Sequence, residues 1–241
     1  ENNVVYAETF ISPDFCGDRD LGAWHEYLAA MREAHVEGVT LKGIVTCIRH
    51  LGPEKAREAA FCAAETAGDW VVGFGMAGAE NVGRAKDYSY SFDMAREAGL
   101  RLTSHAGEWC GAESVWETLR DLRVERIGHG VHSVNDPKLV EHLAETGVAL
   151  EINPGSNVAL GVYPSWIDHP IKRLRDAGVK VTVSTDDPPF FDTTMTREFA
   201  ELESAYGWGA EDFKFLNQTA LEVAFCDLDT KEVIAKRLET L

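Results

Sequence analysis

Histidine and acidic side chains follow several short apolar runs in this sequence of 241 residues. They are His105 and Glu108 after one run, His129 at the end of the next, and Asp186 and Asp187 after a later run. Imidazole nitrogen and carboxylate oxygen are ligands that suit Zn²⁺, and Fe²⁺, Co²⁺ and Mn²⁺ are harder to exclude. A bound divalent metal lowers the pKa of its water, and a buried carboxyl group can donate a proton. These residue types therefore indicate metal-assisted hydrolysis at an sp² carbon.

The apolar runs that precede these residues are the predicted strands. They are short, rich in Val and Ile, and not cleanly alternating, which is typical of strands buried on both faces of a parallel sheet. The predicted strands are residues 4–11, 39–48, 71–76, 100–104, 126–130, 149–152 and 180–184.

Amphipathic helical stretches separate the predicted strands, and several end in the glycine that a helix C-terminus favours. The predicted helices are residues 22–36, 53–67, 86–98, 112–122, 137–145 and 169–177, followed by 196–206 and 212–225. Repeated β-α units imply a parallel sheet, either an open doubly wound sheet or a closed eight-stranded barrel. No G-x-G-x-x-G follows the first strand, which weakens a dinucleotide-binding interpretation. In a barrel, reactive residues sit at the C-terminal ends of the strands.

Charge and cysteine content narrow the class of partner. The net charge of −17 has the wrong sign for binding nucleic acid or anionic membranes, and favours small uncharged or cationic substrates. The five cysteines form no C-x-x-C motif, which disfavours a zinc ribbon or a thioredoxin-type site. We find neither a signal peptide pattern nor an apolar run long enough to span a membrane, and expect a cytoplasmic protein with reduced thiols.

Five segments resemble, in order, motifs of the adenosine deaminase family, and the similarity runs from about residue 4 to about residue 225. The segments are residues 72–80 around Ala77-Gly78, Ser-His-Ala-Gly-Glu at 104–108, Arg-Ile-Gly-His-Gly at 126–130, Pro-Gly-Ser-Asn at 154–157, and Ser-Thr-Asp-Asp-Pro at 184–188. The resemblance implies an α/β protein with a parallel (β/α)8 TIM-type barrel and extra C-terminal helices. We expect residues 1–241 to form a single barrel domain, N-terminally incomplete.

The resemblance also implies roles for the residues that follow the strands. His105 and Asp186 would be ligands of one Zn²⁺ per chain, and Asp186 would also touch the attacking water. Glu108 would protonate the purine ring nitrogen next to the carbon under attack. His129 would orient the metal-bound hydroxide and act as a base or an electrostatic partner.

Two further residues would bind the substrate. Asp187 would hydrogen-bond the imidazole side of the purine, and the backbone N–H of Gly78 would contact the pyrimidine ring. The predicted reaction is hydrolysis of adenosine to inosine and ammonia. The alternatives are deamination of adenine or another 6-aminopurine, or a purine-binding relative that has lost its metal site. A deaminase of the cytidine or RNA-editing type is disfavoured because its H-x-E…P-C-x-x-C signature is absent.

This sequence departs from the family pattern in two ways. The family carries a His-x-His pair after its first strand, and no His-x-His occurs here. The strand at 4–11 resembles the family's second, so we expect the first strand and its ligand pair to be missing from this chain. Gly75 and Ala79 stand where acidic residues are common, and Asn153 stands where cysteine is frequent.

The other histidines, and the acidic residues on helices, are interpreted as structural or solvated. Among these histidines, His132 is the strongest candidate for a functional role, because it lies just after the strand that ends near His129. The residues in this group are His25, His35, His50, His132, His142 and His169, with Glu33, Glu37, Glu54 and Glu58 as solvated helix faces.

Overall fold

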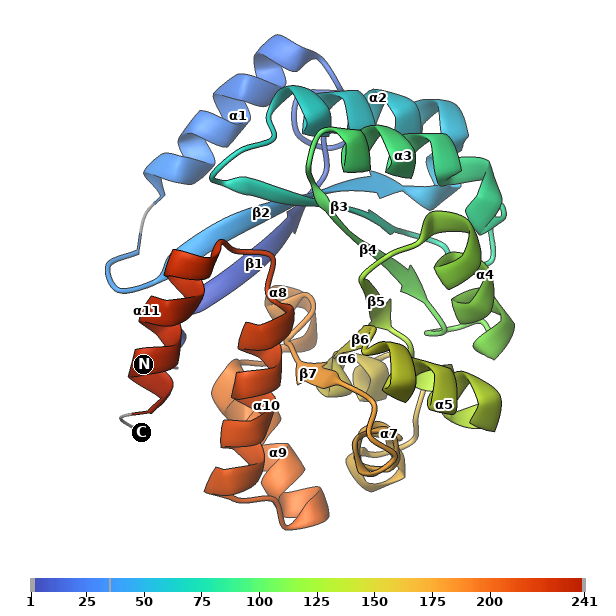
Figure 1. The fold of residues 1–241 in the computed structure, drawn as a ribbon, viewed down its shortest axis with the longest axis vertical. Helices are drawn as coiled ribbons and strands as arrows, with labels where there is room; N and C mark the ends of the chain where they lie inside the picture. The colour runs from blue at the N-terminus through green and yellow to red at the C-terminus, as the bar shows by residue number, and fades with distance from the viewer. Residues whose placement is uncertain (1–2, 35, 240–241) are drawn as a thin grey trace. The chain divides into compact units, whose positions relative to one another are not determined.

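The computed structural model describes residues 3–34 and 36–239, which fall into two compact units (Figure 1). The N-terminal unit holds Val4–His105 and Trp116–Glu125. The C-terminal unit holds Ala106–Val115 and the residues from Arg126 onward. Among the described residues, no helix is both long enough and apolar enough to cross a membrane.

Four parallel strands pair in chain order in the N-terminal unit. Their helices include α2 and α3, which lie side by side in Figure 1. Ile44, Phe74 and Met76 are fully buried, and α2 presents small residues such as Ala59 to this core. The elements are β1 (Tyr6–Ile11), α1 (Leu21–Glu33), β2 (Thr40–Ile48), η1 (Arg49–Leu51), α2 (Pro53–Glu65), β3 (Val71–Ala77), η2 (Ala85–Tyr88), α3 (Ser89–Glu97), β4 (Arg101–Ala106) and α4 (Ala112–Leu122), which runs across the boundary between the units.

Three further parallel strands pair in chain order in the C-terminal unit, with Ile127 opposite Leu150 and Leu150 opposite Val181. Helix α10 packs on β7 and on α11. The elements are β5 (Arg126–His129), η3 (Val131–Asn135), α5 (Pro137–Thr146), β6 (Ala149–Ile152), α6 (Pro154–Ala159), η4 (Trp166–Asp168), α7 (Ile171–Asp176), β7 (Val181–Val183), α8 (Pro188–Phe191), α9 (Met195–Tyr206), α10 (Ala210–Val223) and α11 (Leu228–Leu238).

The parallel strands and the helices between them confirm the predicted β-α repeat. Strand order follows chain order within each unit, as in a barrel, whereas a doubly wound sheet reverses its order at a switch point. The missing first strand, a closed barrel and a single domain stay predictions. The prediction for His35 lies outside the described residues. Helix α1 ends at Glu33, before the predicted end at residue 36.

Several predicted boundaries were wrong for identifiable reasons. Strand β5 ends at His129, because His129 and Gly130 both adopt left-handed backbone angles that a strand cannot continue. The helix predicted at 169–177 begins at Ile171, after Pro170. Residues 154–157 open helix α6 rather than forming only a turn, and α11 was not predicted.

Candidate active site

His129 ends β5 in a conformation that only close packing sustains. Its φ is +61° and that of Gly130 is +67°, two successive left-handed residues. This region is unfavourable for a residue with a side chain, and such strain is concentrated at functional sites. A Cβ atom on Gly130 would lie 2.5 Å from Leu150 Cδ2, so only glycine fits there. The backbone therefore turns sharply after the strand and holds the His129 ring in the buried interior.

Two carboxylates face the two nitrogens of the His129 ring. Glu108 Oε1 lies 3.7 Å from Nδ1, and Asp186 Oδ2 lies 3.8 Å from Nε2. Both distances exceed that of a hydrogen bond, so the three side chains are grouped without being locked to one another. The structure thus brings together the three residues predicted to be catalytic, all within the C-terminal unit.

Asp186 is held by its backbone and by one hydroxyl group. Its φ of +58° is also left-handed, and the buried Ser156 hydroxyl donates a 2.7 Å hydrogen bond to Oδ2. A hydrogen bond to a carboxylate favours the ionised form and fixes its orientation. Asp187, the predicted purine contact, comes next in the chain and is exposed at the N-cap of α8.

The segment that supplies Ser156 also supplies two amides to His129. Nδ2 of Asn153 lies 3.3 Å from His129 Nδ1, and Nδ2 of Asn157 lies 3.2 Å from the same nitrogen. In the sequence, Asn153 was notable only because it stands where cysteine is frequent in the family. The structure shows instead that both asparagines contact the predicted catalytic histidine.

A buried carboxyl group, that of Glu198, contacts the backbone of residues 153–157. Glu198 of α9 is fully buried, and it accepts hydrogen bonds from the Gly155 N–H at 3.0 Å and the Thr193 hydroxyl at 2.7 Å. Burial raises the pKa of Glu198 above its ordinary value. A Cβ on Gly155 would lie 2.2 Å from Glu198 Oε1, so a larger residue at this position would displace the Glu198 carboxyl group.

The remaining predicted residues, His105 and Gly78, belong to the N-terminal unit. His105 Nδ1 lies 3.1 Å from the Met76 carbonyl oxygen, and Gly78 is exposed just beyond β3 with a φ of +95°. The Ala79 N–H donates to His50 Nδ1 at 3.3 Å, so His50 is structural, as expected. We call Glu108, His129 and Asp186, which all belong to the C-terminal unit, the His129 group.

The donor chemistry of His105 and Asp186 fits a divalent metal. A carbonyl oxygen can only accept, so His105 donates from Nδ1 to Met76 and a neutral imidazole keeps its lone pair on Nε2. This arrangement, with the second ring nitrogen bonded to a carbonyl, is usual for metal-binding histidines. The Ser156 hydroxyl orients Asp186 by donating a hydrogen bond to its carboxylate. A structural zinc site takes four protein ligands and a catalytic one three, and each of these side chains has the donor chemistry of one such ligand.

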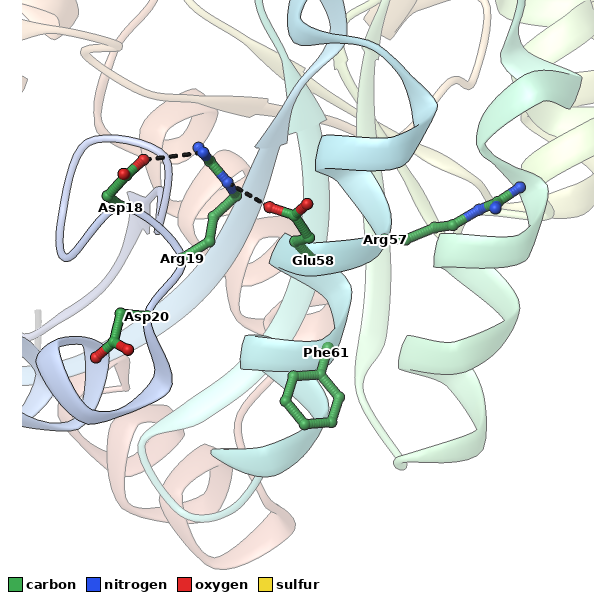
Figure 2. Close-up of a pocket in the computed structure, with 6 residues that line it drawn as sticks. All are labelled: Asp18, Arg19, Asp20, Arg57, Glu58 and Phe61. Carbon is green, nitrogen blue, oxygen red and sulfur yellow. Dashed lines mark hydrogen bonds and ion pairs between the residues drawn. The ribbon is translucent and has the colours of Figure 1, made fainter.

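The N-terminal unit carries an open hollow of about 520 Å³, which Figure 2 shows with its lining residues. The Arg19 guanidinium there contacts Asp18 at 2.9 Å and Glu58 at 2.7 Å, while Arg57 points away and lies over the Tyr90 ring. The lining residues are Asp18, Arg19, Asp20, Arg57, Glu58 and Phe61.

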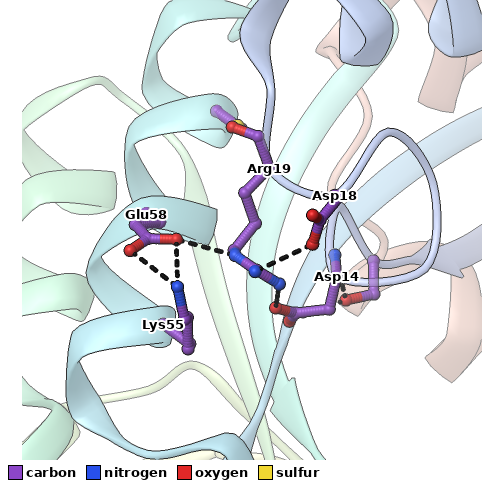
Figure 3. A network of polar contacts seen from close by, with 7 residues as sticks. Asp14, Asp18, Arg19, Lys55 and Glu58 are labelled. Atoms are coloured by element: carbon purple, nitrogen blue, oxygen red, sulfur yellow. Dashed lines mark hydrogen bonds and ion pairs between the residues drawn. The ribbon is translucent and has the colours of Figure 1, made fainter.

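We call Asp14, Asp18, Arg19, Lys55 and Glu58 the Arg19 cluster (Figure 3). Arg19 also contacts the buried Asp14 carboxylate at 2.7 Å, and Lys55 contacts Glu58 at 3.0 Å. Glu58 was predicted to be only a solvated helix residue; it is half-exposed but paired on both sides. Because Arg19 is surrounded by three carboxylates, this hollow is interpreted as a structural ion-pair network.

Comparison with known proteins agrees with the class that the β-α repeat and the His129 group define. The family model described as adenosine deaminase matches residues 1–241. An adenine deaminase of Agrobacterium fabrum is 48% identical over 244 residues, covering 99% of this chain and 74% of that protein. This chain therefore belongs to the adenosine deaminase family.

Two solved structures are similar over nearly the whole chain. The adenine deaminase of Arthrobacter aurescens has a TM-score of 0.89 at 27% identity, covering 99% of this chain and 74% of that one. An amidohydrolase of Burkholderia ambifaria, solved with bound Zn, also has a TM-score of 0.89, at 26% identity, covering 99% of this chain and 68% of that one.

His169 is the functional candidate that the sequence analysis missed. It was expected to be a surface residue or a hydrogen-bonded structural one, and the second is what the structure shows: the ring is buried, with Nε2 3.1 Å from Asn157 Oδ1. The Pro-Gly-Ser-Asn segment marked Asn157 as notable. Nothing in the spacing of His169 indicated that it would reach that asparagine, because the contact depends on the loop between α6 and α7.

Proposed function

We propose that this protein hydrolyses adenine to hypoxanthine and ammonia. The observation that carries the proposal is the group of Glu108, His129 and Asp186, which joins a buried imidazole to two carboxylates. The relatives at 42% to 48% identity are named adenine deaminases, which supports adenine over the adenosine predicted from the motifs. The net charge of −17 also favours a small neutral substrate over a nucleic acid.

In the proposed reaction, the oxygen of water forms a bond to C6 of the purine, the bond from C6 to the amino nitrogen breaks, and ammonia leaves. Of the two protons of the water, one completes the ammonia and the other restores the Glu108 carboxyl group. Glu108, whose side chain is 13% exposed, donates a proton to the ring nitrogen beside C6 as negative charge develops there. His129 and Asp186 orient the attacking oxygen from the other side of the group. Asp187 and the backbone N–H of Gly78 bind the purine edge.

We propose that His105 and Asp186 hold Zn²⁺, which when bound lowers the pKa of water and makes a nucleophile available at neutral pH. The Met76 carbonyl and the Ser156 hydroxyl orient these two side chains. The competing hypothesis is a purine-binding relative that has lost its metal site.

The test is turnover of adenine and adenosine, followed by ultraviolet absorbance, before and after removal of metal by a chelator. We expect adenine to be converted with the higher kcat/KM, activity to disappear with the metal, and zinc to restore it. A preference for adenosine would return the assignment to the nucleoside. Purine binding without turnover, in protein loaded with zinc, would support the inactive relative.

A further inference from the structure

A chain of hydrogen bonds runs from a backbone N–H to the His129 ring. The Ile171 N–H donates to His169 Nδ1 at 3.2 Å. His169 Nε2 lies 3.1 Å from Asn157 Oδ1, and Asn157 Nδ2 lies 3.2 Å from His129 Nδ1. Each of the three side chains is buried, so no water competes along the chain.

The first link sets the direction of every later one. A backbone N–H can only donate, so Nδ1 of His169 is an acceptor and a neutral ring carries its proton on Nε2. That N–H donates to Asn157 Oδ1, which places the amide nitrogen of Asn157 against His129. The amide nitrogen is a donor only, and so His129 Nδ1 accepts. Nδ2 of Asn153, 3.3 Å from the same lone pair, acts in the same direction.

The surroundings of His169 keep it neutral and in place. Burial, with a smaller effect of the Arg173 charge, lowers the pKa of His169 to about 3. The Tyr206 hydroxyl donates to the His169 carbonyl oxygen at 2.7 Å, and the Tyr163 ring packs against the imidazole with centroids 5.2 Å apart. A charged His169 would need a second acceptor at Nδ1, where the Ile171 N–H already lies.

We propose that His169 is a positioning residue that acts through Asn157 to hold neutral His129 with its proton on Nε2. Nε2 is the nitrogen that faces Asp186, at 3.8 Å from Oδ2. His129 therefore donates a hydrogen bond to the attacking oxygen and does not accept a proton at that atom. The sequence left His129 as a base or an electrostatic partner, and this hydrogen-bond chain selects the second role. This consequence rests on the proposed deaminase function, whereas the tautomer does not.

The tautomer is measured by ¹⁵N NMR of the metal-free protein with labelled histidine, with the His129 signal assigned by its loss in His129→Gln. Three variants are compared with the parent. His169→Phe keeps the ring volume and removes the donor, and His169→Gln keeps a donor. Tyr163→Phe is the matched control, since it keeps the ring beside His169 and removes a hydroxyl that, among the described residues, donates to the Val131 carbonyl at 3.4 Å.

We expect His129 protonated on Nε2 in the parent, His169→Gln and Tyr163→Phe proteins, and a mixture of tautomers in His169→Phe. In the zinc-loaded protein, His169→Phe should lower kcat for adenine about tenfold with little change in KM, and His169→Gln should restore most of it. A His129 proton on Nδ1 in the parent protein overturns the proposal, even if His169→Phe does not fold. An unchanged tautomer in folded His169→Phe does the same. Absence of purine turnover in the parent would count against the proposed function and leave the NMR result valid.

Discussion

The Arg19 cluster and the His129 group are both polar networks, but they differ in charge and burial. The first joins formal charges at 2.7–3.0 Å beside an open hollow, with the Glu58 side chain 47% exposed. In the second, the imidazole of His129 is buried, and the two carboxylates lie 3.7 and 3.8 Å from its nitrogens. The hydrogen bonds that reach this imidazole from the Ile171 N–H join neutral groups.

The two networks differ in what they determine. In the Arg19 cluster, ions of opposite sign neutralise one another, and no proton position is in question. In the His129 group, each donor has one allowed direction, so the network decides which atom carries a proton. The density of charge alone does not identify the site, because the Arg19 cluster joins more formal charges than the His129 group.

Arg19→Met should have the largest effect on stability, because it leaves the buried Asp14 carboxylate without its guanidinium partner. Removing one member of a buried ion pair costs about 3 kcal/mol of unfolding free energy. Denaturant unfolding measures it, and kcat of the folded protein should stay unchanged. Lys55→Met is the control, since Lys55 is exposed and should cost less than about 1 kcal/mol. Equal losses in the two variants would show that burial of Asp14 is not what matters.

Ser156→Ala should act on function with little effect on folding. It removes the hydroxyl that holds Asp186 Oδ2 at 2.7 Å, and loss of a group that orients a metal ligand costs about 10- to 100-fold in affinity or activity. Zinc titration against a competing chelator and kcat for adenine measure the two effects. Unchanged zinc affinity, with the protein folded, would argue that Asp186 does not bind the metal. Ser204→Ala, at an exposed position in α9, is the control.

Glu58→Gln should have the smallest effect, below about 1 kcal/mol, because solvent screens this half-exposed carboxylate. Hydrogen bonds from Lys55 first, and then from Arg19, lower the pKa of Glu58 in the folded protein. Its contribution is therefore present above the unfolded carboxyl pKa of about 4.3 and is lost as pH falls through the lower folded pKa. Unfolding curves of parent and variant should differ at neutral pH and converge near about pH 3. A difference that grows on acidification would contradict this sign.

Local sequence predicted those features that depend on neighbouring residues. The strand runs, and the glycines that end the helices before them, follow from residue type and short spacing. Asp186 and His129 were found because they follow strands whose C-terminal ends share one edge of a parallel sheet. The contacts of His169, Glu198 and Arg19 were not predicted. Each joins residues separated by an intervening loop or helix, and no periodic pattern encodes which buried partner such a side chain reaches.

The central claim is that the His129 group, and not the Arg19 cluster, performs the chemistry. The most direct test is the rate of ammonia release from adenine by the zinc-loaded protein and by two matched variants, Glu108→Gln and Glu58→Gln. We expect Glu108→Gln to lower kcat by about 10²-fold or more, since it removes the proton donor, and Glu58→Gln to retain the parent rate. Full activity in Glu108→Gln, or loss of activity in folded Glu58→Gln, would contradict the account.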